Sequence, residues 1–220
     1  GYAAYKLGDP TAKNLGRLTL NPIRHLDPFG ALCMVFFHFG WAKPVPINPR
    51  YFRHPKRDFA VTALAGPFSN LILAFFSAFF YLAFYRILYP VSYPSELALN
   101  LATCLLGFFL IFHQINLGIA LFNLIPVPPL DGSRILNVLL PERIYFGIMK
   151  YERIIYWVLI GWLFLGGRVA AILLAVPVVA ANPVLSALCY VLDLSGMLGD
   201  LITCVSELMF SFWKLLPFLA

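Results

Sequence analysis

The sequence predicts an α-helical integral membrane protein, a polytopic helix bundle with a short β-strand region between its early helices. Hydrophobic residues make up 61% of the 220 residues and charged residues only 12%, whereas a soluble domain is about half apolar and about a quarter charged. The mean hydropathy is +0.82. The chain therefore has too little polar surface to cover a water-facing exterior, and lipid is the expected solvent.

Two uninterrupted apolar segments predict membrane-spanning helices. Phe59–Tyr85 and Leu97–Leu130 contain no Asp, Glu, Lys or Arg, and each is longer than the roughly 20 residues that cross a bilayer. The second segment ends in a proline-rich stretch at 126–129. Because proline interrupts a helix, we expect helix to about Leu124 and irregular chain after it.

Other segments are less regular. Gly16–Leu20 alternates apolar and polar side chains and favours a short strand. Pro28–Ala42 is uncharged but short for a span, and fits a tilted helix, a buried helix or a re-entrant segment. The proline-rich residues 44–49 must be extended. Ile154–Leu192 is apolar apart from Arg168 and fits one kinked span or two shorter passes.

Charged residues near the C-terminus recur at seven-residue intervals, which places them on one helical face: Asp193, Asp200, Glu207 and Lys214. An amphipathic helix that packs this polar stripe against protein or lipid headgroups explains the pattern. A proton path along the stripe is the alternative.

The formal charge of +6 lies in loops beside apolar runs and does not form a nucleic-acid-binding stripe. The basic segments 43–57 and 134–153 have the pattern of cytoplasmic loops. One span then leads out and the next returns, so the break at 126–132 lies towards the cytoplasmic side. We divide the chain into a membrane core at 1–153 and C-terminal transmembrane or amphipathic helices at 154–220.

The most informative stretch is residues 122–132, Phe-Asn-Leu-Ile-Pro-Val-Pro-Pro-Leu-Asp-Gly. Non-helical backbone at the end of a span is tolerated only when buried in protein or facing a wet cavity. An acid there is costly unless it is paired or bound to a cation. Asp131 is therefore a candidate ligand for zinc, which accepts carboxylate oxygen. Alternatively, Asp131 or Ser133 caps a helix that begins near Arg134, and these residues alone leave both interpretations open.

The histidines and cysteines suggest no local metal site. The cysteines form no Cys-x-x-Cys pair, and free buried thiols are expected. No two histidines are four residues apart, so we assign none as a ligand: His25, His38, His54 and His113. His38 and His113 lie in apolar stretches, where a hydrogen-bonded interior histidine is the simpler interpretation.

Four sequence blocks, in order, resemble the site-2 protease family of intramembrane zinc metalloproteases. The stretch Asn123-x-x-Pro-x-Pro-Pro-Leu-Asp131-Gly is similar to the signature of that family. The other similar blocks precede it and are Gly1–Ala12, Gly16–Pro22 with His25–Pro28, and Gly40–Pro46 with Ala65–Asn70. Together the blocks cover about residues 1–140.

The resemblance implies that Zn²⁺ is the cofactor and that Asp131 is its third protein ligand. It also implies that Asn123, and less directly Asn70, line the catalytic cavity and hold the substrate backbone; helix–helix hydrogen bonding is the alternative role for both amides. The implied substrate is a transmembrane segment of another protein. The implied enzyme is a multi-pass protein of the prokaryotic cell membrane. Leu18–Leu20 and Val45–Ile47 could offer a strand edge to the unwound substrate.

The sequence departs from the family in one respect. The His-Glu-x-x-His motif, which supplies two zinc ligands and the general base, does not occur and should end just before Gly1. We therefore expect an N-terminally incomplete, inactive chain. The alternative is a non-catalytic pseudoprotease or truncated membrane module. A small transporter, suggested by broken helices and Arg168, is disfavoured by the motif around Asp131.

Overall fold

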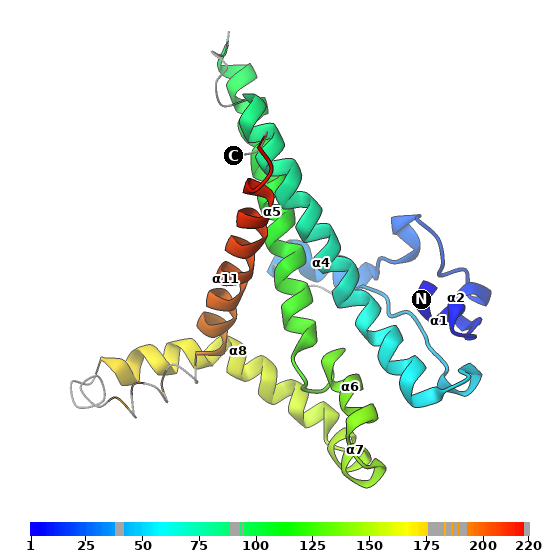
Figure 1. The fold of residues 1–220 in the computed structure, drawn as a ribbon. Coiled ribbons are helices and arrows are strands. Elements are labelled where there is room, and N and C mark those ends of the chain that lie inside the picture. The colour runs from blue at the N-terminus through cyan, green and yellow to red at the C-terminus, as the bar shows by residue number, and fades with distance from the viewer. Residues whose placement is uncertain are drawn as a thin grey trace.

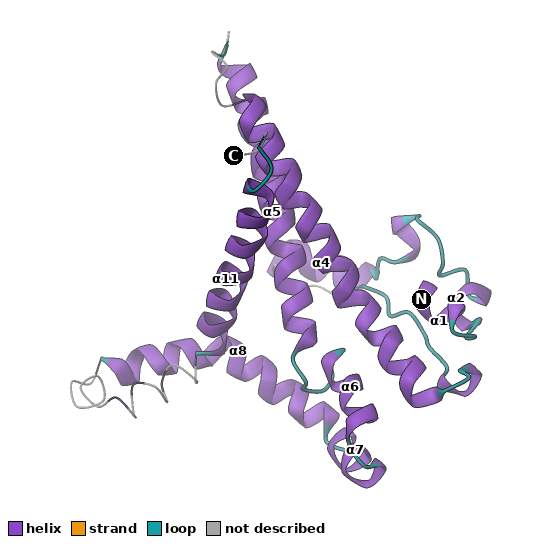
Figure 2. Ribbon diagram, viewed as in Figure 1, coloured by secondary structure: helices purple, strands orange, loops and turns teal. Residues whose placement is uncertain are grey.

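The computed structural model describes residues 1–37, 42–88, 93, 95–175, 183, 186, 189 and 193–217. Figure 2 shows that helices and loops make up the described part of the chain. The elements are α1 (Tyr2–Lys6), α2 (Thr11–Asn14), the 3₁₀ turn η1 (Pro22–Arg24), α3 (Pro28–Phe37), the 3₁₀ turn η2 (Pro49–Tyr51), α4 (Pro55–Leu88), α5 (Glu96–Leu124), α6 (Gly132–Leu139), α7 (Glu142–Met149), α8 (Glu152–Leu174) and α11 (Leu194–Lys214).

The centre of the molecule is an antiparallel hairpin of α4 and α5, which lie side by side along most of their length (Figure 1). Both helices are long and apolar enough to cross a membrane. Ser95 starts α5 by accepting a hydrogen bond from the Ala98 N–H at 3.3 Å. The helix ends at Leu124, where the proline-rich stretch predicts its end. The hairpin therefore brings the start of α4 and the loop after α5 to the same end of the molecule.

Helix α11 packs against α4, α5 and α8 and closes one side of the hairpin. The fully buried His113 of α5 links this helix to α4 and α11. Its Nδ1 lies 2.8 Å from the Ala74 carbonyl of α4, and its Nε2 lies 2.9 Å from Ser206 Oγ of α11. A carbonyl oxygen only accepts, so Nδ1 carries the proton. Interior hydrogen bonding of His113 is thus confirmed. Trp213 of α11 donates to the Phe75 carbonyl at 2.8 Å.

Helix α8 is bent by 47° between Glu152–Leu163 and Leu165–Leu174. The two halves add a third membrane-crossing candidate only if they form a single span. Much of the remainder of 154–192 lies outside the described residues, and so the choice between one kinked span and two passes stays open. Asp193 accepts a hydrogen bond from the Gly196 N–H at 2.9 Å and starts α11.

The predicted short strand at Gly16–Leu20 is wrong, and no strand is found in the described ranges. The segment instead begins as a turn after α2, in which the Arg17 N–H donates to the Ala12 carbonyl at 2.8 Å. An isolated bridge pairs Leu26 with Ala42. Proline at 44 and 46 removes the backbone donors that a ladder requires. Residues 43–48 are therefore neither helix nor strand; proline favours extended backbone in the residue before it, and Asn48 is extended.

Buried charged side chains hold this extended segment in place of a sheet. Arg17 is 9% exposed and donates to the carbonyls of Arg24, Lys43 and Pro44, at 2.5 Å for Lys43 and 3.1 Å for Pro44. Asp9 is fully buried and accepts from the Asn48 N–H at 2.8 Å. The N-terminal region is thereby tied to the segment that enters α4.

The uncharged stretch Pro28–Ala42 begins as helix α3, which Asp27 caps by accepting from the N–H groups of Phe29 at 2.9 Å and Gly30 at 3.1 Å. Residues 38–41, which include His38, lie outside the described residues. The described part of this stretch is therefore helical, and its placement relative to the membrane stays a prediction.

Candidate functional site

A cavity of about 680 Å³ lies where the N-terminal region, α4 and the loop after α5 meet. One face of α4 forms much of its wall, because residues three and four apart share a helix face. The lining residues are Gly1, Tyr2 and Ala3, Ile47 of the extended segment, Phe59, Thr62, Ala63, Ala65, Gly66 and Ser69 of α4, and Pro129, Asp131 and Arg134.

Asp131 reaches this cavity because the chain turns sharply between α5 and α6. The Leu130 N–H donates to the Val127 carbonyl at 2.9 Å, and the Ser133 hydroxyl donates to the Leu130 carbonyl at 2.7 Å. Gly132 is required at the turn, since a Cβ atom there would collide with the carbonyl oxygens of Leu124 and Ile125. The local sequence thus folds the loop back so that Asp131 faces α4.

The carboxylate of Asp131 lies against the glycine of α4. Its Oδ2 atom is 3.5 Å from the position that a Cβ atom on Gly66 would take. Asp131 occupies the N-cap position of α6, yet its side chain makes no capping hydrogen bond. The Ser133 hydroxyl bonds to a carbonyl and not to a helix N–H. The capping interpretation of the sequence is therefore wrong for both side chains.

The half-buried environment disfavours the ionised form of Asp131. Burial raises the pKa of this carboxyl group, and the positive charge of Arg134 opposes the rise. An ionised group at this position gains stability from a nearby positive charge. A carboxylate that is poorly solvated and has no capping bond has the properties expected of a cation ligand.

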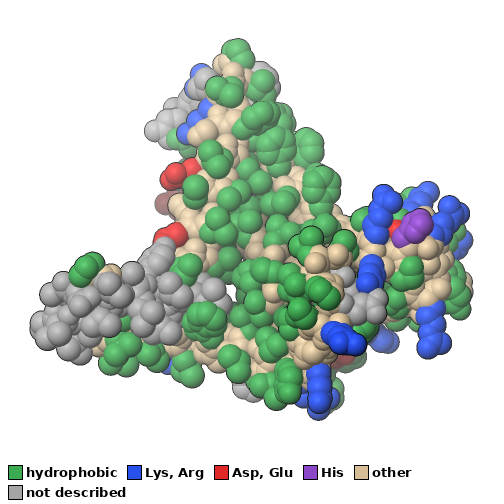
Figure 3. Space-filling view, turned by 60° about the horizontal axis from the view of Figure 1, so that its bottom comes forward, with side chains coloured by type: hydrophobic (Ala, Val, Ile, Leu, Met, Phe, Trp, Pro, Cys, Tyr) green, Lys and Arg blue, Asp and Glu red, His purple; other side chains and the backbone are tan. Residues whose placement is uncertain are grey.

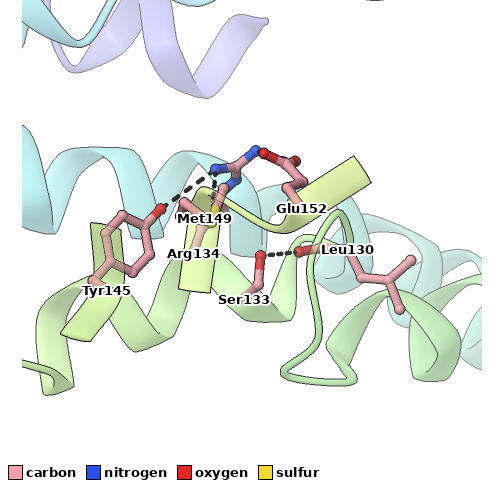
Figure 4. A network of polar contacts seen from close by, with 6 residues as sticks. All are labelled: Leu130, Ser133, Arg134, Tyr145, Met149 and Glu152. Atoms are coloured by element: carbon pink, nitrogen blue, oxygen red, sulfur yellow. Dashed lines mark hydrogen bonds and ion pairs between the residues drawn. The ribbon is translucent and has the colours of Figure 1, made fainter. Parts of the chain in front are cut away.

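Arg134 lines the cavity, and Figure 4 shows its side chain reaching Tyr145 of α7 and Glu152 of α8. Its guanidinium donates to the Tyr145 hydroxyl at 3.3 Å and pairs with Glu152 at 3.4 Å. It also lies over the Phe59 ring, 5.3 Å from the centroid. Partly exposed ion pairs contribute only about 0–1 kcal/mol. The network orients the guanidinium more than it stabilises the fold.

The structure describes both predicted substrate-binding amides. Asn70 is half-buried on α4, four residues beyond Gly66, and Asn123 is half-buried in the last turn of α5. Neither is among the described residues that line the cavity with Asp131. Their role in substrate binding stays a prediction.

The described residues do not bring together three His, Cys, Asp or Glu side chains that could hold a metal ion. His25 contacts the Thr19 carbonyl through Nε2 at 2.8 Å, and His113 is enclosed between helices. Asp131 carries a carboxylate oxygen, which is a donor that zinc accepts. The described residues alone do not make a zinc centre, which needs at least two more ligands.

Sequence reasoning missed Arg134 as a residue of the site. The sequence places Arg134 in a basic segment near the start of a predicted helix. Asp131 and Arg134 are three residues apart, and such residues share one face of a helix start. That spacing could have identified it. The partners Tyr145 and Glu152 depend on how α7 and α8 fold back, which no local pattern specifies.

The hairpin, the proline-rich loop and the inward-facing Asp131 define a membrane protein with a cavity, lined by Asp131 and Arg134, at one end of its apolar helices. Residues 26–166 match the sequence profile of Peptidase family M50. The chain belongs to this family, the site-2 protease family, as its sequence blocks predict.

The chain is also similar to a Bacillus subtilis (strain 168) protein described as "Putative zinc metalloprotease YwhC". The two are 49% identical over 143 residues, which is 65% of this chain and 63% of the relative. The matched region thus spans less than two thirds of the length of that relative. No solved structure matches this chain.

Proposed function

We propose that this chain is part of an intramembrane zinc metalloprotease that hydrolyses peptide bonds in transmembrane segments of other proteins. The observation that carries the proposal is the uncapped, half-buried carboxylate of Asp131, which faces a cavity at one end of a membrane-helix hairpin. Membership of Peptidase family M50 supports a metalloprotease. Asp131 would serve as one zinc ligand.

Zinc in such a site supplies a Lewis acid and a bound water whose pKa lies near 7. A zinc ion at this site would need two further protein ligands in addition to Asp131, and hydrolysis would need a general base. The family resemblance assigns them to a His-Glu-x-x-His helix directly before Gly1. The arrangement supports this, because Gly1 and Asp131 line the same cavity, so that residues preceding Gly1 would enter beside the carboxylate.

The substrate helix must unwind before its peptide bonds become accessible, and residues 43–48 offer an extended chain to the unwound segment. Ile47 of this segment lines the cavity with Asp131, and Val45 lines a neighbouring cavity of about 450 Å³ with Leu18. Ile47→Pro removes a backbone donor from this edge. Cleavage of a model transmembrane substrate at the unchanged rate would exclude the strand edge.

The protein is proposed to cross a prokaryotic cell membrane several times. The start of α4 and the segment joining α6 to α8 both carry an excess of Lys and Arg, and both lie at the same end of the hairpin. By the positive-inside tendency, this charge distribution supports an orientation in which this end, with Asp131, faces the cytoplasm. This orientation can be measured directly by introducing single cysteines, Arg57→Cys or Ser95→Cys, and testing from which side of the membrane a thiol reagent reaches each one.

The test of the metal assignment is Asp131→Asn in the protein that includes the segment preceding Gly1. We expect loss of zinc, measured by metal analysis of the purified protein, and loss of cleavage of a model transmembrane peptide. Asp27→Asn is the matched control, because it makes the same chemical change at the cap of α3. An Asp131→Asn protein that retained a full equivalent of zinc would refute the ligand role.

A non-catalytic membrane module is the second candidate, favoured because the described residues hold no group of three metal-ligating side chains. The coding sequence directly upstream of Gly1 separates the two candidates. A His-Glu-x-x-His motif there supports the protease, and uninterrupted coding sequence without the motif supports a pseudoprotease.

A further inference from the structure

A second cavity, of about 370 Å³, lies on the other side of Arg134 and Phe59, which line both cavities. Its walls combine apolar and aromatic side chains with two cationic groups. The lining residues are Pro49, Pro55, Lys56, Phe59, Arg134, Tyr145, Phe146 and Met149. No step of the proposed proteolysis uses this cavity.

The position of the cavity along the hairpin fits the depth of lipid headgroups. Pro55 is the first residue of α4, and α6 and α7 follow the end of α5, so the cavity is built where the two membrane-crossing helices end. The short helix α7 exposes Ile144 and Phe146 while Tyr145 is buried. Exposed aromatic and aliphatic side chains beside basic ones are typical of an element that lies in the membrane interface.

The charge around the cavity is strongly positive. Exposed basic side chains lie just before or at the start of α4, and in or beside α7 and α8: Arg53, Arg57, Arg143, Lys150 and Arg153. Two acids nearby are engaged, since Asp58 accepts from the His54 N–H at 2.9 Å and Glu152 pairs with Arg134. Figure 3 shows Lys and Arg side chains gathered at the lower and right parts of the view, beside a largely hydrophobic surface.

Arg134 can hold an anion in addition to its protein partners. A guanidinium has five N–H donors, and the contacts of Arg134 to Tyr145, Met149 and Glu152 are long, at 3.3, 3.9 and 3.4 Å. Phosphate oxygens form short, charge-assisted hydrogen bonds with such donors. The first turn of α4 adds the positive end of a helix dipole beside Lys56.

We propose that this cavity binds the phosphate headgroup of an anionic phospholipid between Lys56 and Arg134. The start of an acyl chain lies along the apolar wall of Phe59, Phe146 and Met149. Basic pockets at the cytoplasmic ends of membrane helices are suited to anionic headgroups. The apolar wall and the interfacial depth select a lipid over free phosphate, which would leave that wall exposed to water.

The experiment measures lipid binding to the purified full chain in detergent by native mass spectrometry. Phosphatidylglycerol and phosphatidylcholine are the two lipid probes, and inorganic phosphate is the competitor. We expect one retained phosphatidylglycerol and much weaker retention of phosphatidylcholine. Lys56→Gln should weaken phosphatidylglycerol binding about fivefold, and Lys56→Gln with Arg134→Gln about thirtyfold, from the usual contribution of one cation near an anionic headgroup.

Two variants separate a bound headgroup from diffuse attraction. Arg53→Gln with Arg57→Gln removes the same charge from the same end, but neither residue lines the cavity. Lys56→Arg keeps the charge and should keep the binding. This result would show that the loss in Lys56→Gln comes from the removed charge and not from misfolding caused by substitution at this position. Equal losses in the two double variants, equal retention of the two lipids, or displacement by millimolar phosphate would each overturn the proposal.

Discussion

Asp9→Asn is expected to release the extended segment that carries Ile47 into the candidate site. Asp9 Oδ1 accepts from the Thr11 N–H at 2.9 Å and from the Thr11 hydroxyl, and Oδ2 accepts from the Asn48 N–H at 2.8 Å. An asparagine offers one oxygen and one NH₂ group. One of the two backbone N–H groups would then face another donor in a site that is fully buried.

The size of the effect follows from these bonds. A hydrogen bond to a charged group contributes about 1.5–3 kcal/mol, and an unsatisfied buried donor costs about 1–3 kcal/mol. The local opening of residues 43–48 should therefore become about 2–4 kcal/mol easier. Since about 1.4 kcal/mol is a factor of ten, amide exchange at Asn48 should accelerate from about 30-fold to several hundred-fold.

Hydrogen–deuterium exchange of peptides that cover residues 42–52 measures this acceleration. Asp27→Asn is the control, because both bonds that Asp27 makes use Oδ1, and asparagine caps a helix about as well as aspartate. The control should leave exchange at Asn48 unchanged. If Asp9→Asn and Asp27→Asn gave the same exchange at Asn48, the side chain of Asp9 would not hold the segment.

Acid should produce the same release in the unaltered protein. Burial alone would raise the pKa of Asp9, but hydrogen bonds from the Thr11 hydroxyl, the Asn48 N–H and the Thr11 N–H outweigh it and lower the pKa below its ordinary 3.8. A lowered folded pKa means that the stabilisation is complete above the ordinary value and is lost as pH falls through the folded value. Protection of Asn48 should be constant near neutral pH and fall only below 3.8. Asp9→Asn should lack this acid step.

Further substitutions test the loop and the helix packing. Gly132→Ala should lower the melting temperature and displace Asp131, because the added Cβ meets the backbone of Leu124 and Ile125, at an overpacking cost of about 1–3 kcal/mol. Gly147→Ala is the control, because no atom of the described residues lies within 4 Å of the added Cβ there. His113→Leu should loosen α11 by about 1–3 kcal/mol, since Ser206 loses its partner. Proteolysis within α11 measures this opening, and unaltered cleavage would contradict it.

The sequence was sufficient for the features that depend on local composition. Stretches without charge predict α4 and α5, and the prolines at 126–129 predict the end of α5 near Leu124. It was insufficient for Gly16–Leu20, where alternation alone favours a strand. There the side chain of Arg17 makes the long-range bonds that a backbone ladder would otherwise make, and alternation does not reveal such contacts.

The candidate site was predictable only in part, for the same reason. The proline-rich loop singles out Asp131, but its position beside Gly66 depends on the packing of α6 against α4. The orientation of Arg134 depends on its contacts with Tyr145 of α7 and Glu152 of α8, and no local sequence pattern specifies how these helices fold back. The assignment of Asn70 and Asn123 to substrate binding rests on resemblance alone, and neither is among the described residues that line the cavity with Asp131.

The environment of Asp131 gives a physical reason to treat it as a ligand. Partial burial disfavours the ionised form of a carboxyl group. It raises the pKa of Asp131, whose side chain makes no capping bond. Arg134 offsets this cost only from a distance, since its ion pair is with Glu152. An acid at the end of a membrane helix is retained where a cation neutralises it. A bound zinc ion would supply that charge in the cavity where the N-terminal residues approach the carboxylate.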